Sequence, residues 1–133
     1  MKTKILALAV IILTLISCSK NDDDTSSNLL IGTWKLTEML IDPGNGSGTF
    51  NSVNSNKNLI FSSGGNLSSN GAICDMSIGT NVSSTGTYSE VNSTINSTAC
   101  PNNTIKYELK GNTLILTYLF CREPCRAKYT RVQ

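Results

Sequence analysis

The side chains that usually carry out acid–base and nucleophilic catalysis are almost absent from this chain. It contains no histidine, so the commonest general base and the commonest metal ligand are both missing. No Gly-x-Ser-x-Gly sequence occurs, and a serine without a neighbouring base is a poor nucleophile. The carboxylates of the expected folded part lack the spacing of a catalytic pair: Glu38, Asp42, Asp75, Glu90, Glu108 and Glu123. We therefore predict a protein that is not an enzyme and that uses no cofactor and no metal.

Cysteines are the remaining reactive side chains, and the first of the five, Cys18, stands apart from the others. Lys2 and Lys4 precede an apolar run over residues 5–16, which is too short to remain as a membrane-spanning helix. The sequence Leu15-Ile16-Ser17-Cys18 resembles the lipobox of bacterial lipoproteins, in which the cysteine is acylated and becomes the new N-terminus. This resemblance implies a signal peptide over residues 1–17, palmitate on Cys18 and a membrane anchor through that lipid.

Residues 18–28 are polar and without periodicity, so we expect a flexible tether. The acidic triplet Asp22-Asp23-Asp24 resembles the signal that directs lipoproteins of the Bacteroidetes to the outer face of the outer membrane. It implies display at the cell surface. The alternative is a solvated spacer that keeps the domain clear of the lipid headgroups. A spacer of this kind does not indicate which face of the outer membrane carries the protein.

Four cysteines remain in the expected folded part: Cys74, Cys100, Cys121 and Cys125. In an exported chain an even set predicts two disulfides, with three possible connectivities. We favour the pairs Cys74–Cys100 and Cys121–Cys125, because the second pair would clamp the turn over residues 122–124. A bond from Cys74 or Cys100 to Cys121 is not excluded. A four-thiolate zinc site is disfavoured, since an oxidising compartment removes the thiolates that it needs.

The charge gives no indication of a nucleic-acid partner. Lys2 and Lys4 leave with the signal peptide, which brings the 11 basic residues level with the 9 acidic ones. No basic cluster with interleaved aromatic residues is left. We expect no binding to nucleic acid.

From Leu29 onward, apolar residues alternate with a period of two, and turn sequences recur about every ten residues. This pattern predicts an all-β domain over residues 29–133, built as a small antiparallel meander of about eight short strands. Such a sheet has to protect its edges, and closure into a barrel does so. The expected strands are residues 31–41, 58–61, 66–69, 71–78, 84–91, 93–99, 105–110, 113–121 and 126–132.

Short sequences near both ends of this domain carry a family resemblance. Gly32-Thr33-Trp34 opens the first expected strand, and Lys128-Tyr129-Thr130-Arg131-Val132 forms the last one. With residues 59–65 and 85–89 between them, they resemble the small lipocalin-like domains of Bacteroidetes lipoproteins, within the calycin superfamily. The resemblance implies that Trp34 closes one end of the barrel beneath Arg131. A guanidinium over an indole ring is stabilised by roughly 0.5–2 kcal/mol.

The same resemblance implies an interior that could hold a small hydrophobic ligand. The possible ligand-lining residues are Leu36, Glu38, Phe61, Tyr107, Leu116 and Tyr118. Alternation places Glu38 on the same face as Trp34, although a strand that twists outward near its end is the simpler explanation. Fatty-acid-binding proteins hold a carboxylate with an arginine and a tyrosine on the last strand, but here Val132 and Gln133 follow Arg131.

Two functions are therefore compatible with the sequence. The first is a non-enzymatic lipocalin-like domain, lipid-anchored at the outer membrane, that binds a small apolar ligand or an extracellular partner. The alternative is a filled barrel that acts only by its outer surface, as an adhesin, an inhibitor or an envelope accessory protein. A barrel of about eight strands permits either. No pocket remains if the following side chains meet across the barrel: Leu36, Leu59, Phe61, Leu67, Tyr107, Leu109, Leu114, Leu116 and Tyr118.

Overall fold

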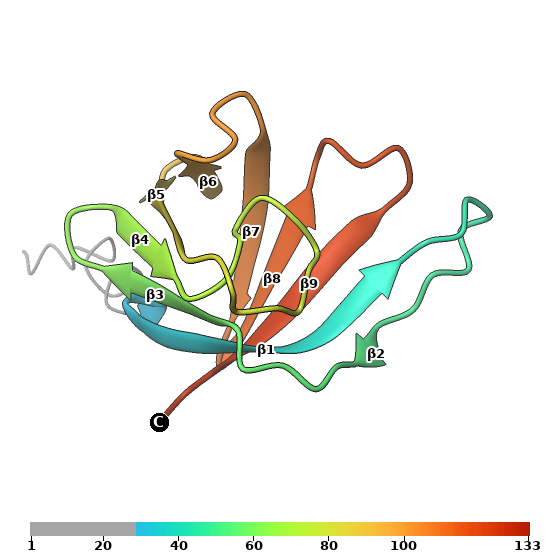
Figure 1. Ribbon diagram of the computed structural model, residues 1–133, viewed down its shortest axis with the longest axis horizontal. Coiled ribbons are helices and arrows are strands. Elements are labelled where there is room, and N and C mark those ends of the chain that lie inside the picture. Colours follow the sequence, from blue (N-terminus) through green and yellow to red (C-terminus); the bar gives the residue numbers. More distant parts are fainter. Residues whose placement is uncertain (1–28) are drawn as a thin grey trace, which may run out of the picture.

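The computed structural model describes residues 29–133 (Figure 1). The predicted signal peptide over residues 1–17, the lipidation site Cys18 and the tether over residues 18–28 lie outside these described residues. Leu29 and Leu30 are helical and lead directly into the first strand. In the described part of the chain, no helix has the length and apolarity needed to cross a membrane.

The described residues form one antiparallel sheet of nine strands. The strands are β1 (Gly32–Ile41), β2 (Asn51–Ser52), β3 (Asn58–Ser62), β4 (Asn66–Ser69), β5 (Ser84–Ser89), β6 (Thr94–Ser97), β7 (Thr104–Lys110), β8 (Thr113–Tyr118) and β9 (Cys125–Arg131). From β3 onward each strand pairs with the next one along the chain, so the connectivity is the predicted meander. The two-residue strand β2 lies beside the second half of β1 and has no counterpart in the prediction.

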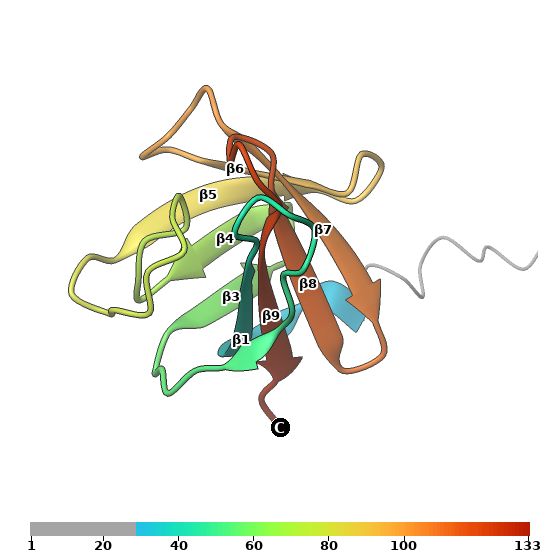
Figure 2. The same cartoon turned by 90° about the vertical axis from the view of Figure 1, so that its right-hand side faces the viewer.

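Pairing between β1 and β9 closes the sheet into a barrel. It runs from Trp34 opposite Arg131 to Ile41 opposite Cys125. Strands β1 and β3 to β9 curve around one interior in the two perpendicular views (Figures 1 and 2). The prediction of a small all-β antiparallel barrel of about eight strands is confirmed.

The two ends of this barrel differ in how the strands are connected. At the end where β1 begins, β3–β4, β5–β6 and β7–β8 are joined by tight turns. We call this the closed end. At the opposite end, the connections are longer and cover residues 42–50, 70–83, 98–103 and 119–124. We call this the loop end.

Two of the strand predictions are wrong at the loop end. Residues 71–78 alternate in polarity but form no strand, because their backbone groups bond to side chains rather than to a neighbouring strand. The predicted strand over residues 113–121 is too long, since β8 ends at Tyr118 and the chain turns back toward Cys125. Alternating polarity therefore indicates an extended backbone, but it does not determine whether another strand is available to pair with it.

Trp34 and Arg131 seal the closed end. Trp34 is completely buried, and its indole Nε1 donates a hydrogen bond of 2.8 Å to the carbonyl oxygen of Leu30. The Arg131 guanidinium carbon lies 4.8 Å from the centroid of the Trp34 ring. The guanidinium also donates to the carbonyl oxygens of Ile31 and Leu29. The first and last strands are thereby joined by apolar, cation–π and hydrogen-bonding contacts at one place.

Gly32 is required for this arrangement. Its backbone has φ +138°, and a Cβ atom at this position would lie 2.8 Å from Nη1 of Arg131. The absence of a side chain therefore lets the guanidinium pass directly over the backbone. This contact gives a physical reason for the glycine two residues before Trp34.

We expect the Trp34→Ala substitution to destabilise the domain by about 3–5 kcal/mol, because it removes a completely buried side chain and its hydrogen bond. Urea denaturation followed by far-ultraviolet circular dichroism measures the change. Val91→Ala is the matched control, since Val91 is 95% exposed and its loss should change stability by less than about 0.5 kcal/mol. A Trp34→Ala variant as stable as this control would contradict the sealing role.

Candidate functional site

Apolar side chains from every wall fill the interior of the barrel. Phe61 lies against Tyr88, with ring centroids 5.1 Å apart, and against Tyr107, at 6.3 Å, so aromatic rings meet across the space between β3, β5 and β7. None of the buried residues of this cluster is more than 9% exposed. The cluster consists of Leu30, Trp34, Leu36, Leu59, Phe61, Leu67, Ile73, Tyr88, Ile95, Ile105, Leu114, Leu116, Tyr118, Cys125, Ala127 and Tyr129.

The predicted ligand-lining residues are part of this packing. Leu36, Phe61, Leu116 and Tyr118 are at most 2% exposed and belong to the cluster, while Tyr107 packs against it. Nine side chains were expected to leave no pocket if they met across the barrel. All nine belong to the cluster or pack against it. In the described part of the chain these side chains therefore form one continuous buried apolar cluster.

Glu38 does not point into the barrel, which corrects its place among the ligand-lining residues. The pairing of β1 with β9 shifts by one residue between Leu36 and Glu38, so Thr37 is the extra residue of a bulge. Beyond the bulge Glu38 lies opposite Lys128, which alternates with the buried Ala127 and Tyr129 and therefore faces outward. The Glu38 carboxylate accepts a hydrogen bond of 2.6 Å from the Lys128 ammonium.

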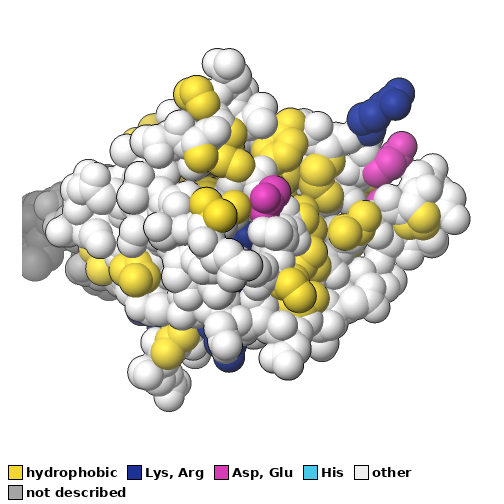
Figure 3. Space-filling model, viewed as in Figure 1, with side chains coloured by type: hydrophobic (Ala, Val, Ile, Leu, Met, Phe, Trp, Pro, Cys, Tyr) yellow, Lys and Arg dark blue, Asp and Glu magenta, His cyan; other side chains and the backbone are white. Residues whose placement is uncertain are grey.

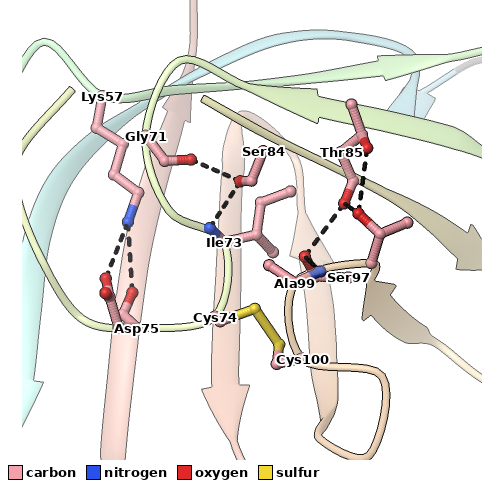
Figure 4. The surroundings of a disulfide bond; sticks show 11 residues. Lys57, Gly71, Ile73, Cys74, Asp75, Ser84, Thr85, Ser97, Ala99 and Cys100 are labelled. Atoms are coloured by element: carbon pink, nitrogen blue, oxygen red, sulfur yellow. Dashed lines mark hydrogen bonds and ion pairs between the residues drawn. A yellow bond between two sulfur atoms is a disulfide. The ribbon is translucent and has the colours of Figure 1, made fainter. Parts of the chain in front are cut away.

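The loop end is crosslinked by two disulfides, Cys74–Cys100 and Cys121–Cys125, which are the pairs favoured from the sequence. The first joins the β4–β5 connection to the β6–β7 connection across 26 positions of the chain (Figure 4). The second encloses the short turn between β8 and β9. In the chain-entropy model, closing the longer loop stabilises the fold by roughly 3–4 kcal/mol.

The β4–β5 connection folds back over the loop end and inserts one side chain into the barrel. We call residues 70–83 the plug segment. Ile73 is only 1% exposed and belongs to the core cluster. Its backbone N–H donates to Ser84 Oγ at 2.9 Å, and Ser84 Oγ donates in turn to the Gly71 carbonyl at 2.7 Å (Figure 4). The plug segment thus supplies part of the core and covers it.

A buried lysine lies beneath the plug segment. Lys57 is 1% exposed, and it directly precedes β3, on the same inward face as Leu59 and Phe61. Its ammonium donates to the carbonyl oxygens of Asp75 at 3.3 Å and Ser77 at 2.9 Å. The Asp75 carboxylate lies 4.0 Å away and is exposed on its outer side. Burial lowers the pKa of Lys57, and the Asp75 charge opposes that shift.

Gly71 makes room for the stem of this lysine. A Cβ atom on Gly71 would lie 2.9 Å from Cγ of Lys57 and 2.6 Å from the carbonyl oxygen of Gly79. The stem therefore runs through the plug segment between backbone groups. Neither Lys57 nor Ile73 was among the predicted site residues, although the period of two places Lys57 on the inner face.

Two tyrosines from neighbouring strands are buried in the barrel. Tyr118 of β8 is 2% exposed and Tyr129 of β9 is 1% exposed. Burial raises the pKa of both phenols, and for Tyr129 the neighbouring Tyr118 adds to the shift.

The loop over residues 42–48 is organised by one carboxylate. Asp42 is 6% exposed and accepts four backbone N–H groups, from Gly44, Asn45 and Gly46 on Oδ1 and from Gly48 on Oδ2. The bond from Gly48, followed by the other three, lowers the pKa of the Asp42 carboxyl against the opposing effect of burial. Asp42 therefore fixes the shape of the loop.

Beside this loop the outer surface is hollowed. A depression of about 600 Å³ lies between residues 42–48 and the β8–β9 turn. Its apolar lining includes Leu40, Leu119 and Pro124, and its charged lining includes Arg122 and Arg126.

Apolar side chains also remain uncovered around the loop end. Ile41, Ile78, Leu119 and Phe120 are between 41% and 64% exposed. Met39, Val53 and Met76 are partly buried and pack against the core cluster. In the space-filling view, hydrophobic side chains form a band beside the plug segment toward the ends of β8, β9 and β1 (Figure 3). We call Ile41, Ile78, Leu119 and Phe120 the apolar rim.

The groups found at this site are ones that make binding contacts. Across residues 29–133 no three Cys, Asp or Glu side chains converge in a way that could hold a metal ion. The charged groups near the rim are Lys57 with Asp75, and Arg122, Glu123 and Arg126 of the β8–β9 turn and β9. Their arrangement offers an ammonium, two guanidinium groups and apolar surface, without a nucleophile next to a base.

Comparison with known protein families gives one match. The family model described as a lipocalin-like domain matches residues 30–116, which is about two-thirds of the chain and extends from the start of β1 into β8. Among curated proteins no significant match is found. The matched region includes Gly32 and Trp34, while β9 with Arg131 follows it.

We expect the free energy of unfolding to fall as the pH rises above about 10, the ordinary tyrosine pKa. Tyr118 and Tyr129 have raised pKa values in the folded state, so their contribution is complete below the unfolded pKa and is lost as the pH approaches the folded values. Urea midpoints at pH 8 and pH 11 measure this loss. Tyr129→Phe should show a smaller decrease than the unmodified protein, and an equal or larger decrease would contradict the assignment.

Proposed function

Because the chain belongs to the lipocalin-like domain family, we propose that it is a non-enzymatic binding protein, lipid-anchored to the outer membrane through Cys18, that acts through the outer surface of a filled barrel. The observation that carries this proposal is the interior packing: the side chains that would line a pocket contact one another. A filled barrel leaves the loops and the outer faces as the places where a partner can bind.

The route of the chain supports an orientation with the loop end away from the membrane. The tether expected over residues 18–28 leads to Leu29, whose carbonyl oxygen accepts a hydrogen bond from Arg131 at the closed end. Strand β1 then extends from Gly32 to Ile41, and ten residues of strand span roughly 33 Å. A lipid on Cys18 would therefore hold the closed end nearest the bilayer and direct the apolar rim outward.

The composition of the loop end supports a protein partner for this surface. Ile41, Ile78, Leu119 and Phe120 are exposed there together, and Arg122 and Glu123 lie beside them. Apolar residues bordered by charged ones are typical of surfaces that bind other proteins. The acidic triplet Asp22-Asp23-Asp24 adds support for display at the cell surface, through its resemblance to an export signal.

A second candidate function is the binding of a small apolar ligand on the outside of the barrel. The depression of about 600 Å³ beside the β8–β9 turn favours it, because its lining combines apolar residues with two arginines. Such a site would leave the interior packing unchanged. The two candidates differ in whether the purified protein carries a small molecule.

Native mass spectrometry of the protein, extracted under mild conditions, tests the proposed function. We expect a mass equal to that of the acylated chain with no further molecule bound, because the interior side chains pack together in one buried apolar cluster. A co-purified lipid or other apolar molecule would contradict the surface-only function. Repeating the measurement with Leu119→Asp then separates the two remaining sites: loss of the molecule points to the depression, and retention points to the interior.

Replacement of Cys18 tests the lipid anchor. We expect Cys18→Ala to abolish the incorporation of labelled palmitate, since no other cysteine follows the apolar run of the signal directly. Ser19→Ala is the matched control and should keep normal labelling. Unchanged labelling of Cys18→Ala would remove the lipoprotein assignment while leaving the barrel function open.

A further inference from the structure

Charged side chains are distributed unevenly around the barrel. Strands β3, β4, β5 and β6 contain no Lys, Arg, Asp or Glu residue. In the other half of the sheet, β1, β7 and β9 alternate buried residues with outward-facing charged ones, and the β8–β9 turn adds an arginine. We call the cations of this half the basic side, and they are Lys35, Lys106, Lys110, Arg122, Arg126 and Lys128.

Carboxylates neutralise only part of the basic side. Glu108 forms an ion pair of 2.8 Å with Lys110, and Glu38 forms one of 2.6 Å with Lys128. The remaining cations form no ion pair among residues 29–133, and they are Lys35, Lys106, Arg122 and Arg126. An excess of positive charge is therefore left on this side.

Two of the unpaired cations lie in one row across the sheet. Thr117 of β8 pairs with Lys106 of β7 and with Arg126 of β9, and Arg126 pairs in turn with Leu40 of β1. Neighbouring strands are about 4.8 Å apart, so Lys106 and Arg126 are separated by roughly 10 Å. The lining of the depression of about 600 Å³ includes Leu40, Thr117 and Arg126. The row of cations and the depression therefore form one continuous surface.

The carboxylates that border the depression lie against its loop. Asp42 has its carboxylate enclosed by four backbone N–H groups, and its own N–H donates to the Pro124 carbonyl at 3.0 Å. Glu123 extends toward the same loop, because a Cβ atom on Gly44 would lie 3.4 Å from Cδ of Glu123. The two arginines in the lining have no such partner among residues 29–133. They are available to an acidic group from outside.

We propose that the depression and the adjoining cations bind an acidic segment of a partner protein. Carboxylates of this segment contact Arg122, Arg126 and Lys106, and an apolar side chain next to them lies in the depression against Leu40 and Leu119. Guanidinium groups bind carboxylates through two parallel hydrogen bonds, which gives such a contact direction as well as strength. This inference rests on the proposed function, because it states the chemistry of the partner that the outer surface would bind.

The combination of charge and apolar surface favours a protein segment over an anionic polysaccharide. Leu119 is 53% exposed and Phe120 is 41% exposed beside the arginines. A polysaccharide carries anionic groups but no aliphatic or aromatic side chain to cover these residues. Protein interfaces combine a buried apolar centre with charged groups at the edge, and opposite charges on the two partners increase the rate of association.

Selection of random peptides displayed on phage tests the proposal, with the protein purified in mild detergent as the bait. We expect the recovered peptides to be enriched in Asp and Glu by at least about twofold over the unselected library, and to carry Leu, Ile, Val or Phe beside them. Recovery of no enriched sequence, or of sequences enriched in Lys and Arg, would overturn the proposal.

A recovered peptide, synthesised with a fluorescent label, then locates the site by anisotropy titration. Arg126→Gln should weaken its binding by about tenfold, whereas Lys35→Gln should weaken it by less than about twofold. Both variants remove one unpaired charge from the basic side, but Lys35 is five positions from Leu40, roughly 16 Å along β1 and beyond the Debye length of about 8 Å at physiological salt. Equal effects of the two variants would contradict a site at the depression.

The apolar half of the site has its own pair of variants. Leu119→Ala should weaken peptide binding by about fivefold, and Val91→Ala, which shortens a 95% exposed residue of the β5–β6 turn, should leave it unchanged. If Leu119→Ala binds like the unmodified protein, or if dextran sulfate binds more tightly than the peptide, the assignment to an acidic protein segment is wrong.

These outcomes are separate from the test of the proposed function. A co-purified molecule in the native mass spectrum contradicts the surface-only function whatever the peptides show. A spectrum without such a molecule, together with peptides that are not acidic, retains the surface function and overturns only the acidic partner.

Discussion

The pairing of β1 with β9 is the interaction on which the rest of the structure depends. A meander of short strands leaves its first and last edges open, and each open edge exposes unpaired backbone groups. Here Trp34 lies opposite Arg131, and the guanidinium both covers the indole and bonds to the carbonyls of residues 29 and 31. Closure gives β9 a second neighbour and lets β1 and β3 to β9 enclose one interior. Without it, the alternating apolar faces of β3 to β9 would have no common core.

The two ends of the barrel are sealed by different means, and this difference agrees with the roles proposed for them. At the closed end, one tryptophan and one arginine finish the core, and the expected tether starts beside them. At the loop end, the plug segment supplies Ile73 to the core and covers Lys57, and a disulfide fastens it. A permanently packed end suits attachment. An end closed by irregular chain with an apolar rim suits recognition, because loops tolerate the exposure and the variation that binding requires.

Two disulfides add to a core of modest size. A domain this small buries a smaller share of its surface than a larger one, so covalent bonds contribute a significant part of its stability. Both bonds lie at the loop end, where the long connections have few strand partners. The same bonds that stabilise the fold therefore also limit how far the connections at the loop end can move. The Cys74–Cys100 bond holds the plug segment, which supplies Ile73 to the core.

The sequence by itself determined the class of fold, and it supplied the expectation that the chain is not an enzyme. A period of two with frequent turns is a local property, so it identified β1 and β3 to β9, and the Gly32–Trp34 sequence identified the closed end. The lack of histidine can be read from the sequence alone.

Only the tertiary structure determined which of the extended segments have a neighbouring strand to pair with. Residues 71–78 alternate like a strand but have none beside them, and the bulge at Thr37 turns Glu38 outward to Lys128. The filling of the barrel likewise depends on side chains that are far apart in sequence, such as Ile73 and Lys57, which the plug segment brings to the same end. Local patterns record which residues are extended, whereas packing between distant segments determines which space remains.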